Sequence, residues 1–149
     1  MKLFLAHSRI SCRWSKPWIY IGHSYLRMNQ WEQNLAGERI SLSNHIRYEV
    51  KKHRWLFLNW IDRQRTANND SLHWWMTHLA GRNNQASNFF DYIVQISALK
   101  TWLKENNNKE LNILLVCEDG FVLKALYDNL YRVYSVKFRP AFIYLYESP

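Results

Sequence analysis

The spacing of apolar and polar residues divides the first third of the chain into two short strands and a short helix. Residues 3–6 and 18–21 are continuous apolar runs of strand length. Pro17 opens the second run and Gly22 closes it. Residues 24–35 are mixed and polar, and we expect a short helix there.

A long amphipathic helix is predicted over residues 43–65, with Ser43 as its N-cap. Apolar positions recur at helical spacing, so one stripe of this helix is expected to face the core. We predict Phe57 and Trp60 to be core residues, and we expect Trp55 to be buried as well. The stripe consists of Ile46, Val50, His53, Phe57 and Trp60.

The remaining apolar runs predict alternating strands and helices. Short strands are expected at residues 72–76, 133–138 and 142–146. Helices are expected at residues 87–105, capped by Ser87, and at 121–130. Residues 111–117 are apolar without alternation, which is typical of a central strand buried on both faces of a parallel sheet.

These elements predict an α/β fold with a three-layer, doubly wound, mostly parallel, Rossmann-like sheet. Helix and strand alternate through the C-terminal half, as in βαβ units. The length of 149 residues fits a single domain, and only 4 Gly and 3 Pro argue against a many-turned β-sandwich. The chain is also interpreted as the N-terminal half of a larger two-domain protein.

Net charge and cysteine content bear on the partners and the compartment of the protein, and not on its fold. The formal net charge of +8 predicts attraction to polyanions or to an anionic membrane surface. Cys12 and Cys117 lack the spacing of a metal site, which favours a reducing compartment. No apolar run reaches membrane-spanning length, and the first residues do not resemble an export signal. We therefore expect a cytoplasmic protein, peripheral to the inner membrane if it is membrane-associated.

Two loops carry residues that could bind a ligand. Asp119 follows the most apolar strand, where ligands bind in open α/β sheets, and could accept hydrogen bonds from a sugar hydroxyl. The alternative is that Asp119 caps the following helix. Arg82 and Asn83 precede a predicted helix N-terminus and could bind a phosphate or carboxylate; the alternative is a solvated loop.

The histidines and the motif content of the chain indicate no metal site and no catalytic group. His45, Glu49 and His53 are spaced four apart, but two helical turns separate the outer pair, so one metal ion cannot bind all three. A packed His53 is the favoured interpretation. No nucleophile motif and no glycine-rich phosphate loop is present, and we predict no cofactor and no metal site.

One side of the predicted helix 43–65 is basic and could face a polyanion such as a nucleic-acid backbone. The alternative is a solvated basic face, since no base-reading motif accompanies it. Its residues are Arg47, Lys51, Lys52 and Arg54, and Arg47, Lys51 and Arg54 are predicted to be exposed.

Residues 72–126 resemble the N-terminal region of bacterial surface-carbohydrate biosynthesis proteins of glycosyltransferase type. The likeness lies in a Trp-rich segment with a Thr, an Arg-Asn loop, a Ser-capped helix starting with Phe, and a buried strand. Its residues are Trp74, Trp75, Met76, Thr77, Arg82, Asn83, Asn84, Ser87 and Phe90. The resemblance implies two Rossmann-like halves and cytoplasmic assembly of cell-envelope polysaccharide. The chain departs from the pattern in lacking a second half.

Two functions from different classes follow as expectations. The first is the acceptor-side N-terminal domain of a glycosyltransferase-like protein, inactive alone, with a glycan or lipid-linked acceptor near Arg82, Asn83 and Asp119. The second is a basic binding domain for nucleic acid or another polyanion.

Overall fold

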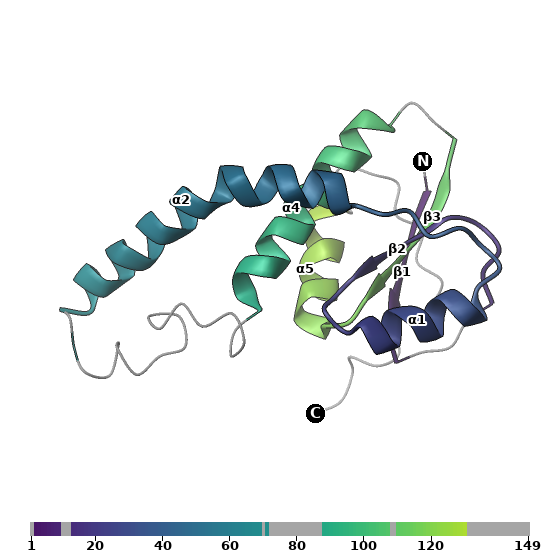
Figure 1. Cartoon of the computed structure of the whole chain (residues 1–149), viewed down its shortest axis with the longest axis horizontal. Coiled ribbons are helices and arrows are strands. Elements are labelled where there is room, and N and C mark those ends of the chain that lie inside the picture. Colours follow the sequence, from purple (N-terminus) through teal and green to yellow (C-terminus); the bar gives the residue numbers. More distant parts are fainter. Residues whose placement is uncertain (1, 10–12, 70, 72–87, 108–109, 131–149) are drawn as a thin grey trace. The chain divides into compact units, whose positions relative to one another are not determined.

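A computed structural model describes residues 2–9, 13–69, 71, 88–107 and 110–130 (Figure 1). Its contacts group the chain into two units. The sheet unit comprises Met1–Ser41 with Leu103–Pro149, and the helical unit comprises Leu42–Trp102. The elements are β1 (Lys2–His7), β2 (Trp18–Ile21), α1 (Tyr25–Asn34), α2 (Ser43–Ala67), α4 (Phe89–Glu105), β3 (Asn112–Cys117) and α5 (Gly120–Leu130).

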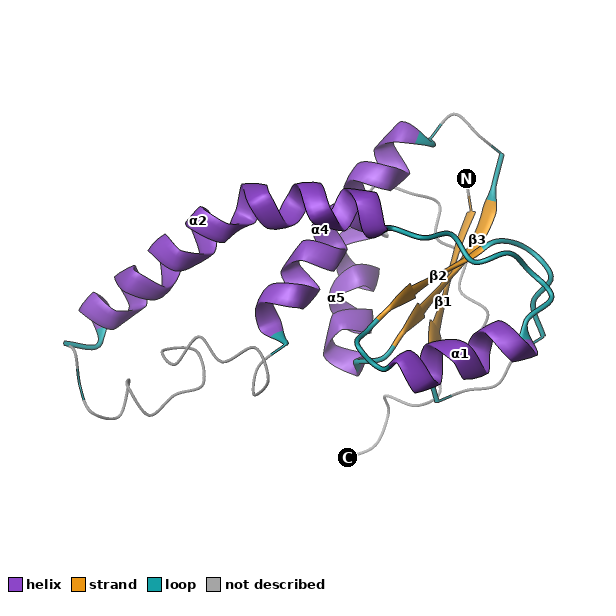
Figure 2. Ribbon diagram, in the orientation of Figure 1, coloured by secondary structure: helices purple, strands orange, loops and turns teal. Residues whose placement is uncertain are grey.

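The sheet unit is built on three parallel strands in the order β1-β3-β2 (Figure 2). Leu3 pairs with Ile113 on one side of β3, and Trp18 pairs with Leu114 on the other. All five residues from Ile113 to Cys117 are fully buried. The prediction of a buried central strand at residues 111–117 is therefore confirmed, as is the parallel sheet within an α/β chain.

Helix α1 packs on one face of this sheet through aromatic side chains. Trp31 and Leu35, at the end of α1, join a buried cluster with Ala6, Trp18, Leu114 and Val116. Each buried indole nitrogen needs an acceptor. The Trp31 Nε1–H donates to the carbonyl of Ser8 (2.9 Å), and the Trp18 Nε1–H donates to the carbonyl of Gly37 (2.9 Å). The tryptophans thus fill the core and also fix the loops beside it.

Gly37 is required by the path of the chain beside Trp18. A Cβ atom at this position would collide with the backbone carbonyl of Lys16. Only a residue without a side chain fits this close approach of two backbone segments.

The short helix expected at residues 24–35 is confirmed as α1. Ser24 caps it, because its Oγ accepts the Arg27 amide hydrogen (3.3 Å). Helix α5 belongs to the same unit: it contacts β1 and β3 and buries Leu126 and Leu130.

The helical unit consists of α2 together with α4 up to Trp102. The long helix predicted from Ser43 is confirmed, but Ser43 is its first helical residue and not its N-cap. Leu42 occupies the cap position and makes no side-chain capping bond. The two helices meet through aromatic rings: the Phe57 ring centroid lies 4.8 Å from that of Phe90 and 6.2 Å from that of Phe89.

The prediction that Trp55 and Trp60 belong to the core is wrong. Trp55 is 70% exposed and Trp60 is 37% exposed, whereas Phe57 is half-buried. Trp55 lies two residues from both His53 and Phe57, about 200° around the helix from the side that faces α4. Trp60 lies against Phe89 of α4, with ring centroids 5.9 Å apart, and yet stays more than a third exposed.

The predicted exposure of the basic residues on α2 is confirmed for Arg47, Lys51 and Arg54, and Lys52 is exposed as well. Among the described helices, none combines the length and the apolar character needed to cross a bilayer. The predicted strands at residues 72–76, 133–138 and 142–146, the Ser87 cap and Cys12 lie outside the described residues.

Candidate functional site

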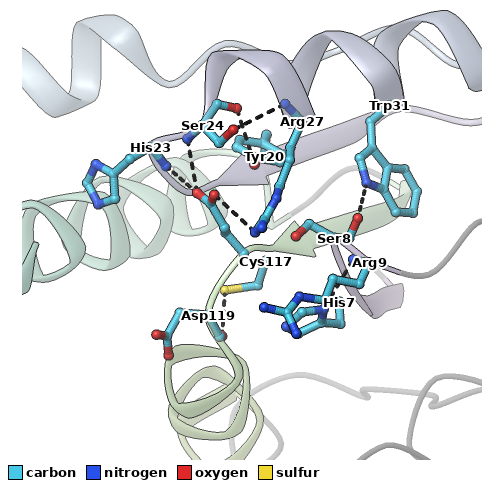
Figure 3. A network of polar contacts seen from close by, with 11 residues as sticks. His7, Ser8, Arg9, Tyr20, His23, Ser24, Arg27, Trp31, Cys117 and Asp119 are labelled. Carbon is cyan, nitrogen blue, oxygen red and sulfur yellow. Dashed lines mark hydrogen bonds and ion pairs between the residues drawn. The ribbon is translucent and has the colours of Figure 1, made fainter.

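The carboxyl ends of the three strands meet at one edge of the sheet. His7 ends β1, Ile21 ends β2, and both pair with Cys117 at the end of β3. Ligands of open α/β sheets bind outside such an edge. The polar residues that follow these strand ends are drawn together in Figure 3. They come from segments about 100 residues apart, and the register of the sheet alone brings them together.

Glu118 joins the end of β3 to the start of α1. Its Oε2 accepts the backbone N–H groups of His23 (2.6 Å) and Ser24 (3.0 Å). Its Oε1 receives the Arg27 Nη1–H at 3.3 Å. A carboxylate is favoured at a helix N-terminus, where it faces the positive end of the helix dipole. Glu118 therefore acts as a structural clamp between the end of β3 and the start of α1.

Gly22 leaves the space that this clamp occupies. A Cβ atom at Gly22 would collide with Oε2 of Glu118 and lie 2.7 Å from its Cβ. We expect Gly22→Ala to lower the free energy of unfolding by about 1–3 kcal/mol, the usual cost of overpacking. Urea unfolding of the full chain measures this loss.

Gln33→Ala, an exposed change on α1, is the matched control and should stay within about 0.5 kcal/mol of the parent protein. If Gly22→Ala were as mild as this control, the proposed contact with Glu118 would not exist in solution.

Asp119 lies at the carboxyl edge and caps α5. Its Oδ1 accepts the amide hydrogens of Phe121 (2.8 Å) and Val122 (3.0 Å). The sequence left open whether Asp119 caps the following helix, and the structure shows that its Oδ1 does so. A role for Asp119 in binding a sugar hydroxyl stays a prediction.

Cys117 is an unreactive thiol. It is fully buried, and its Sγ donates to the carbonyl of Asp119 (3.3 Å). Burial raises the pKa of the Cys117 thiol to about 12. A protonated, inaccessible thiol serves neither as a nucleophile nor as a metal ligand at neutral pH.

His7 experiences a surplus of positive charge. Partial burial lowers its pKa, and the guanidinium groups of Arg9 and Arg27 lower it further. Asp119 and Glu118 act in the opposite direction but with smaller effect. Neutral His7 is therefore favoured, and the edge has a net positive potential at this point.

The tautomer of neutral His7 follows from one backbone contact. The Arg9 amide N–H donates to Nδ1 of His7 at 3.1 Å, so Nδ1 is the acceptor and Nε2 carries the proton. His7 thus offers an Nε2–H donor at the sheet edge, and in this tautomer it is not arranged as a general base.

Sequence reasoning missed most of this site. It selected Asp119 but not His7, Arg9, Arg27 or Glu118. The sequence does carry one signal for these residues, which is their position along the chain. Each of them ends or follows an apolar run, or lies one turn into the next helix. Arg82 and Asn83, the other predicted ligand residues, lie outside the described part of the chain.

A separate polar network lies in the helical unit around Glu49, which is only 1% exposed. Its carboxylate accepts the hydroxyl hydrogens of Ser97 (3.0 Å) and Thr101 (3.0 Å). His53 Nε2 lies 2.9 Å from Oε2 of Glu49, and Lys52 Nζ lies 3.7 Å from the same oxygen. The network closes the contact between α2 and α4.

This network is not a catalytic triad. A triad uses both ring nitrogens of its histidine, one toward the nucleophile and one toward the acid. Here Nε2 of His53 contacts both Ser97 Oγ (2.9 Å) and Glu49. The packed histidine favoured from the sequence is what these contacts show. Within the described ranges, no three His, Cys, Asp or Glu side chains are placed to hold a metal ion.

Comparison with known proteins adds no relative: no family model matches the chain, and neither the curated proteins nor the solved structures searched contain a significant match.

Proposed function

We propose that the carboxyl edge of the sheet binds a phosphate-bearing ligand. The observation that carries this proposal is the placement of His7, Arg9 and Arg27 together at the carboxyl edge of the sheet, where the Arg9 amide contacts His7 and Arg27 reaches Glu118. After burial, the two guanidinium groups are the largest influences that lower the pKa of His7. The carboxylates themselves are committed to helix starts: Glu118 at α1 and Asp119 at α5. Arg9 is then available for an external anion, and Arg27, which pairs with Glu118 at 3.3 Å, keeps further N–H donors.

Three side chains supply suitable donors. His7 offers its Nε2–H, as its contact with the Arg9 amide requires. Arg9 is exposed, and its guanidinium can bind a phosphate through two parallel hydrogen bonds. Arg27 has five N–H donors, and its contact with Glu118 uses one of them.

A phosphate site at this edge is compatible with the glycosyltransferase-type interpretation. Sugar nucleotides and lipid-linked acceptors both carry phosphate groups. In that interpretation the chain is the acceptor-side N-terminal domain of a protein of cell-envelope polysaccharide biosynthesis, with a three-layer, doubly wound sheet. Asp119, Arg82 and Asn83 would contact the sugar part of the ligand.

The site is tested by titrating the isotope-labelled full chain with inorganic phosphate and with a nucleoside diphosphate. We expect chemical-shift changes at His7, Arg9 and His23. The pKa of His7 should rise on binding, because a bound anion stabilises the imidazolium form. Arg9→Gln should weaken binding about 10- to 100-fold, the effect of losing a charge-assisted hydrogen bond.

Arg39→Gln is the matched control, since Arg39 belongs to the same unit and pairs with Glu32 (3.2 Å) on α1. It should leave the affinity unchanged. Equal losses for the two variants, or an unchanged His7 pKa at saturating phosphate, would refute the site.

A further inference from the structure

Ser8, the residue that follows β1, has a buried hydroxyl group whose hydrogen-bonding capacity is unused. Within the described part of the chain, its Oγ is enclosed and has no hydrogen-bond partner. The backbone of Ser8 is paired: its N–H donates to the carbonyl of Cys117 (2.8 Å), and its carbonyl accepts the Trp31 indole N–H (2.9 Å). Folded proteins leave very few buried polar atoms without a partner, because each one costs free energy. The Ser8 hydroxyl therefore calls for a group that completes it.

The hydroxyl of Ser8 lies on the face of the sheet that α1 covers. Side chains alternate between the two faces of a strand, so Ser8 continues the row of Ala6, which packs in the cluster with Trp31. Arg27 is one turn before Trp31 on the same side of α1, and is therefore nearer to the carboxyl edge of the sheet. Figure 3 shows the Ser8 hydroxyl pointing away from Trp31, on the side of Arg27. Ser8 thus faces the same edge as the proposed phosphate site.

The side chains of the proposed phosphate site are donors, and none of them can accept the Ser8 hydrogen. The guanidinium groups of Arg9 and Arg27 have N–H groups but no acceptor. The Nδ1 of His7 already accepts the Arg9 amide hydrogen, so its Nε2 carries the proton. The group that completes Ser8 must therefore supply an acceptor, and a negatively charged oxygen is the strongest acceptor for a hydroxyl donor.

We infer that Ser8 binds the phosphate directly and selects a terminal phosphate group, an inference that rests on the proposed function. The Ser8 Oγ–H donates to one phosphate oxygen, while Arg9 and the His7 Nε2–H donate to the others. Arg27 controls access to Ser8, because its side chain is 38% exposed and its contact with Glu118 is 3.3 Å long. When the guanidinium turns from Glu118 toward the anion, the Ser8 hydroxyl becomes reachable from the edge of the sheet.

A terminal phosphate fits this arrangement better than a phosphodiester does. Because the Ser8 Oγ is buried, the oxygen that reaches it must project from the free end of the ligand. A terminal phosphate has three acceptor oxygens and about two negative charges at neutral pH. A phosphodiester continues as a chain on both sides, so its free oxygens do not enter as deeply. The site is therefore matched to the end of a nucleotide or sugar phosphate rather than to a nucleic-acid backbone.

Ser8→Ala separates this binding role from a structural one. In the free chain the urea midpoint should stay unchanged or rise, because the variant loses no hydrogen bond and no longer buries an unpaired hydroxyl. Binding of inorganic phosphate and of a nucleoside diphosphate, titrated into the isotope-labelled full chain, should nevertheless weaken about tenfold or more, the effect of one hydrogen bond to a charged group. A lower midpoint with unchanged affinity would give Ser8 a structural role only and would overturn the inference.

Two further variants assign the loss of affinity to the hydroxyl itself. Ser8→Cys keeps a side chain at this position but replaces the hydroxyl by a weak donor, so it should also weaken phosphate binding. Full affinity in Ser8→Cys would overturn the inference. Ser15→Ala is the matched control, since Ser15 is an exposed serine of the same unit, and it should leave both the midpoint and the affinity unchanged.

The preference for a terminal phosphate is tested with a dinucleoside monophosphate, whose single phosphate is a diester. The parent chain should bind this diester more weakly than the nucleoside diphosphate. Ser8→Ala should leave the affinity for the diester within about twofold of the parent value, because the diester does not reach the hydroxyl. Equal relative losses for the two ligands would show that Ser8 does not select a terminal phosphate.

Failure of this inference is distinguishable from failure of the proposed function. If the parent chain bound neither inorganic phosphate nor the nucleoside diphosphate, both would be wrong. If Arg9→Gln weakened binding while Ser8→Ala bound both ligands as tightly as the parent chain, the phosphate site would stand and the role of Ser8 would be wrong.

Discussion

Val116→Asp is expected to abolish the cooperative unfolding transition of the sheet unit at neutral pH. Val116 is fully buried in the central strand, where it pairs with Ala6 on one side and Tyr20 on the other. It also belongs to the cluster around Trp18 and Trp31. An unpaired carboxylate there costs several kcal/mol, comparable with the roughly 5–15 kcal/mol that stabilises a whole domain. Urea unfolding followed by circular dichroism and tryptophan fluorescence measures the change.

The control introduces the same side chain where water can reach it. Phe121 is 82% exposed in the first turn of α5, a position where a negative charge is favoured. Phe121→Asp should therefore leave the free energy of unfolding within about 0.5 kcal/mol of the parent value. A cooperative transition of Val116→Asp within about 1 kcal/mol of the parent would show that β3 is not a buried central strand.

Glu49→Ala should cost about 3–5 kcal/mol, because it leaves the buried groups that depend on the carboxylate without their acceptor. The Ser97 and Thr101 hydroxyls lose bonds of 3.0 Å each, and His53 loses its carboxylate partner. The matched control is Asp62→Ala on the same helix. Asp62 is exposed and pairs only across the surface with Arg65, so its removal should cost less than about 1 kcal/mol.

The same carboxylate makes the stability sensitive to acid. Burial alone would raise the pKa of Glu49, but the bonds from Ser97 and Thr101, with Lys52 and His53 nearby, lower it below its usual value of 4.5. The folded state therefore binds this proton less readily than the unfolded chain does. The stabilisation is complete above about pH 4.5 and is lost as the pH falls through the lower folded-state value.

Urea midpoints measured between pH 3 and pH 7, a range of about four pH units around the Glu49 titration, test this sign. Glu49→Gln should remove the part of the acid dependence that belongs to Glu49, because an amide does not titrate. An identical pH profile for the two proteins would mean that another group carries the dependence.

The parts of the fold that could be predicted are those encoded by local pattern. Residues 111–117 lack alternation because β3 is covered on both faces, and that requirement is visible in the sequence itself. Helix α2 was also visible from its spacing. Its first residue was misassigned, because a serine at a helix start can be either the cap or the first helical residue.

Burial along α2 could not be predicted, because it depends on where the partner helix lies. A tryptophan is normally assigned to the core and a glutamate to the surface. Here Trp55 points away from α4 while Glu49 points toward it. The hydroxyl groups that offset the cost of burying Glu49 belong to Ser97 and Thr101. These residues are about 50 positions away, so the sequence around Glu49 does not reveal them.

The candidate site shows the same limit in another form. The roles of His7, Arg27 and Glu118 arise from a register that joins the two ends of the described chain. Asp119 could be selected from the sequence because it follows the clearest strand, and its cap contacts are with residues two and three positions away. Glu118 could not be selected in this way, because its partners lie near the start of α1, more than 90 residues away in the sequence.

The strand order has a consequence for how the chain acquires its structure. β1 and β2 each pair with β3 rather than with each other, and each pairing closes a loop of roughly 100 residues. During synthesis, the first two strands leave the ribosome before their common partner β3, which is complete only when residue 117 has followed. The helical unit, whose two helices are both encoded inside that interval, has its partners available earlier. Assembly of the sheet is therefore the late and slow event, and the interval before it is when the exposed strands of this basic chain are most open to pairing with the wrong partner.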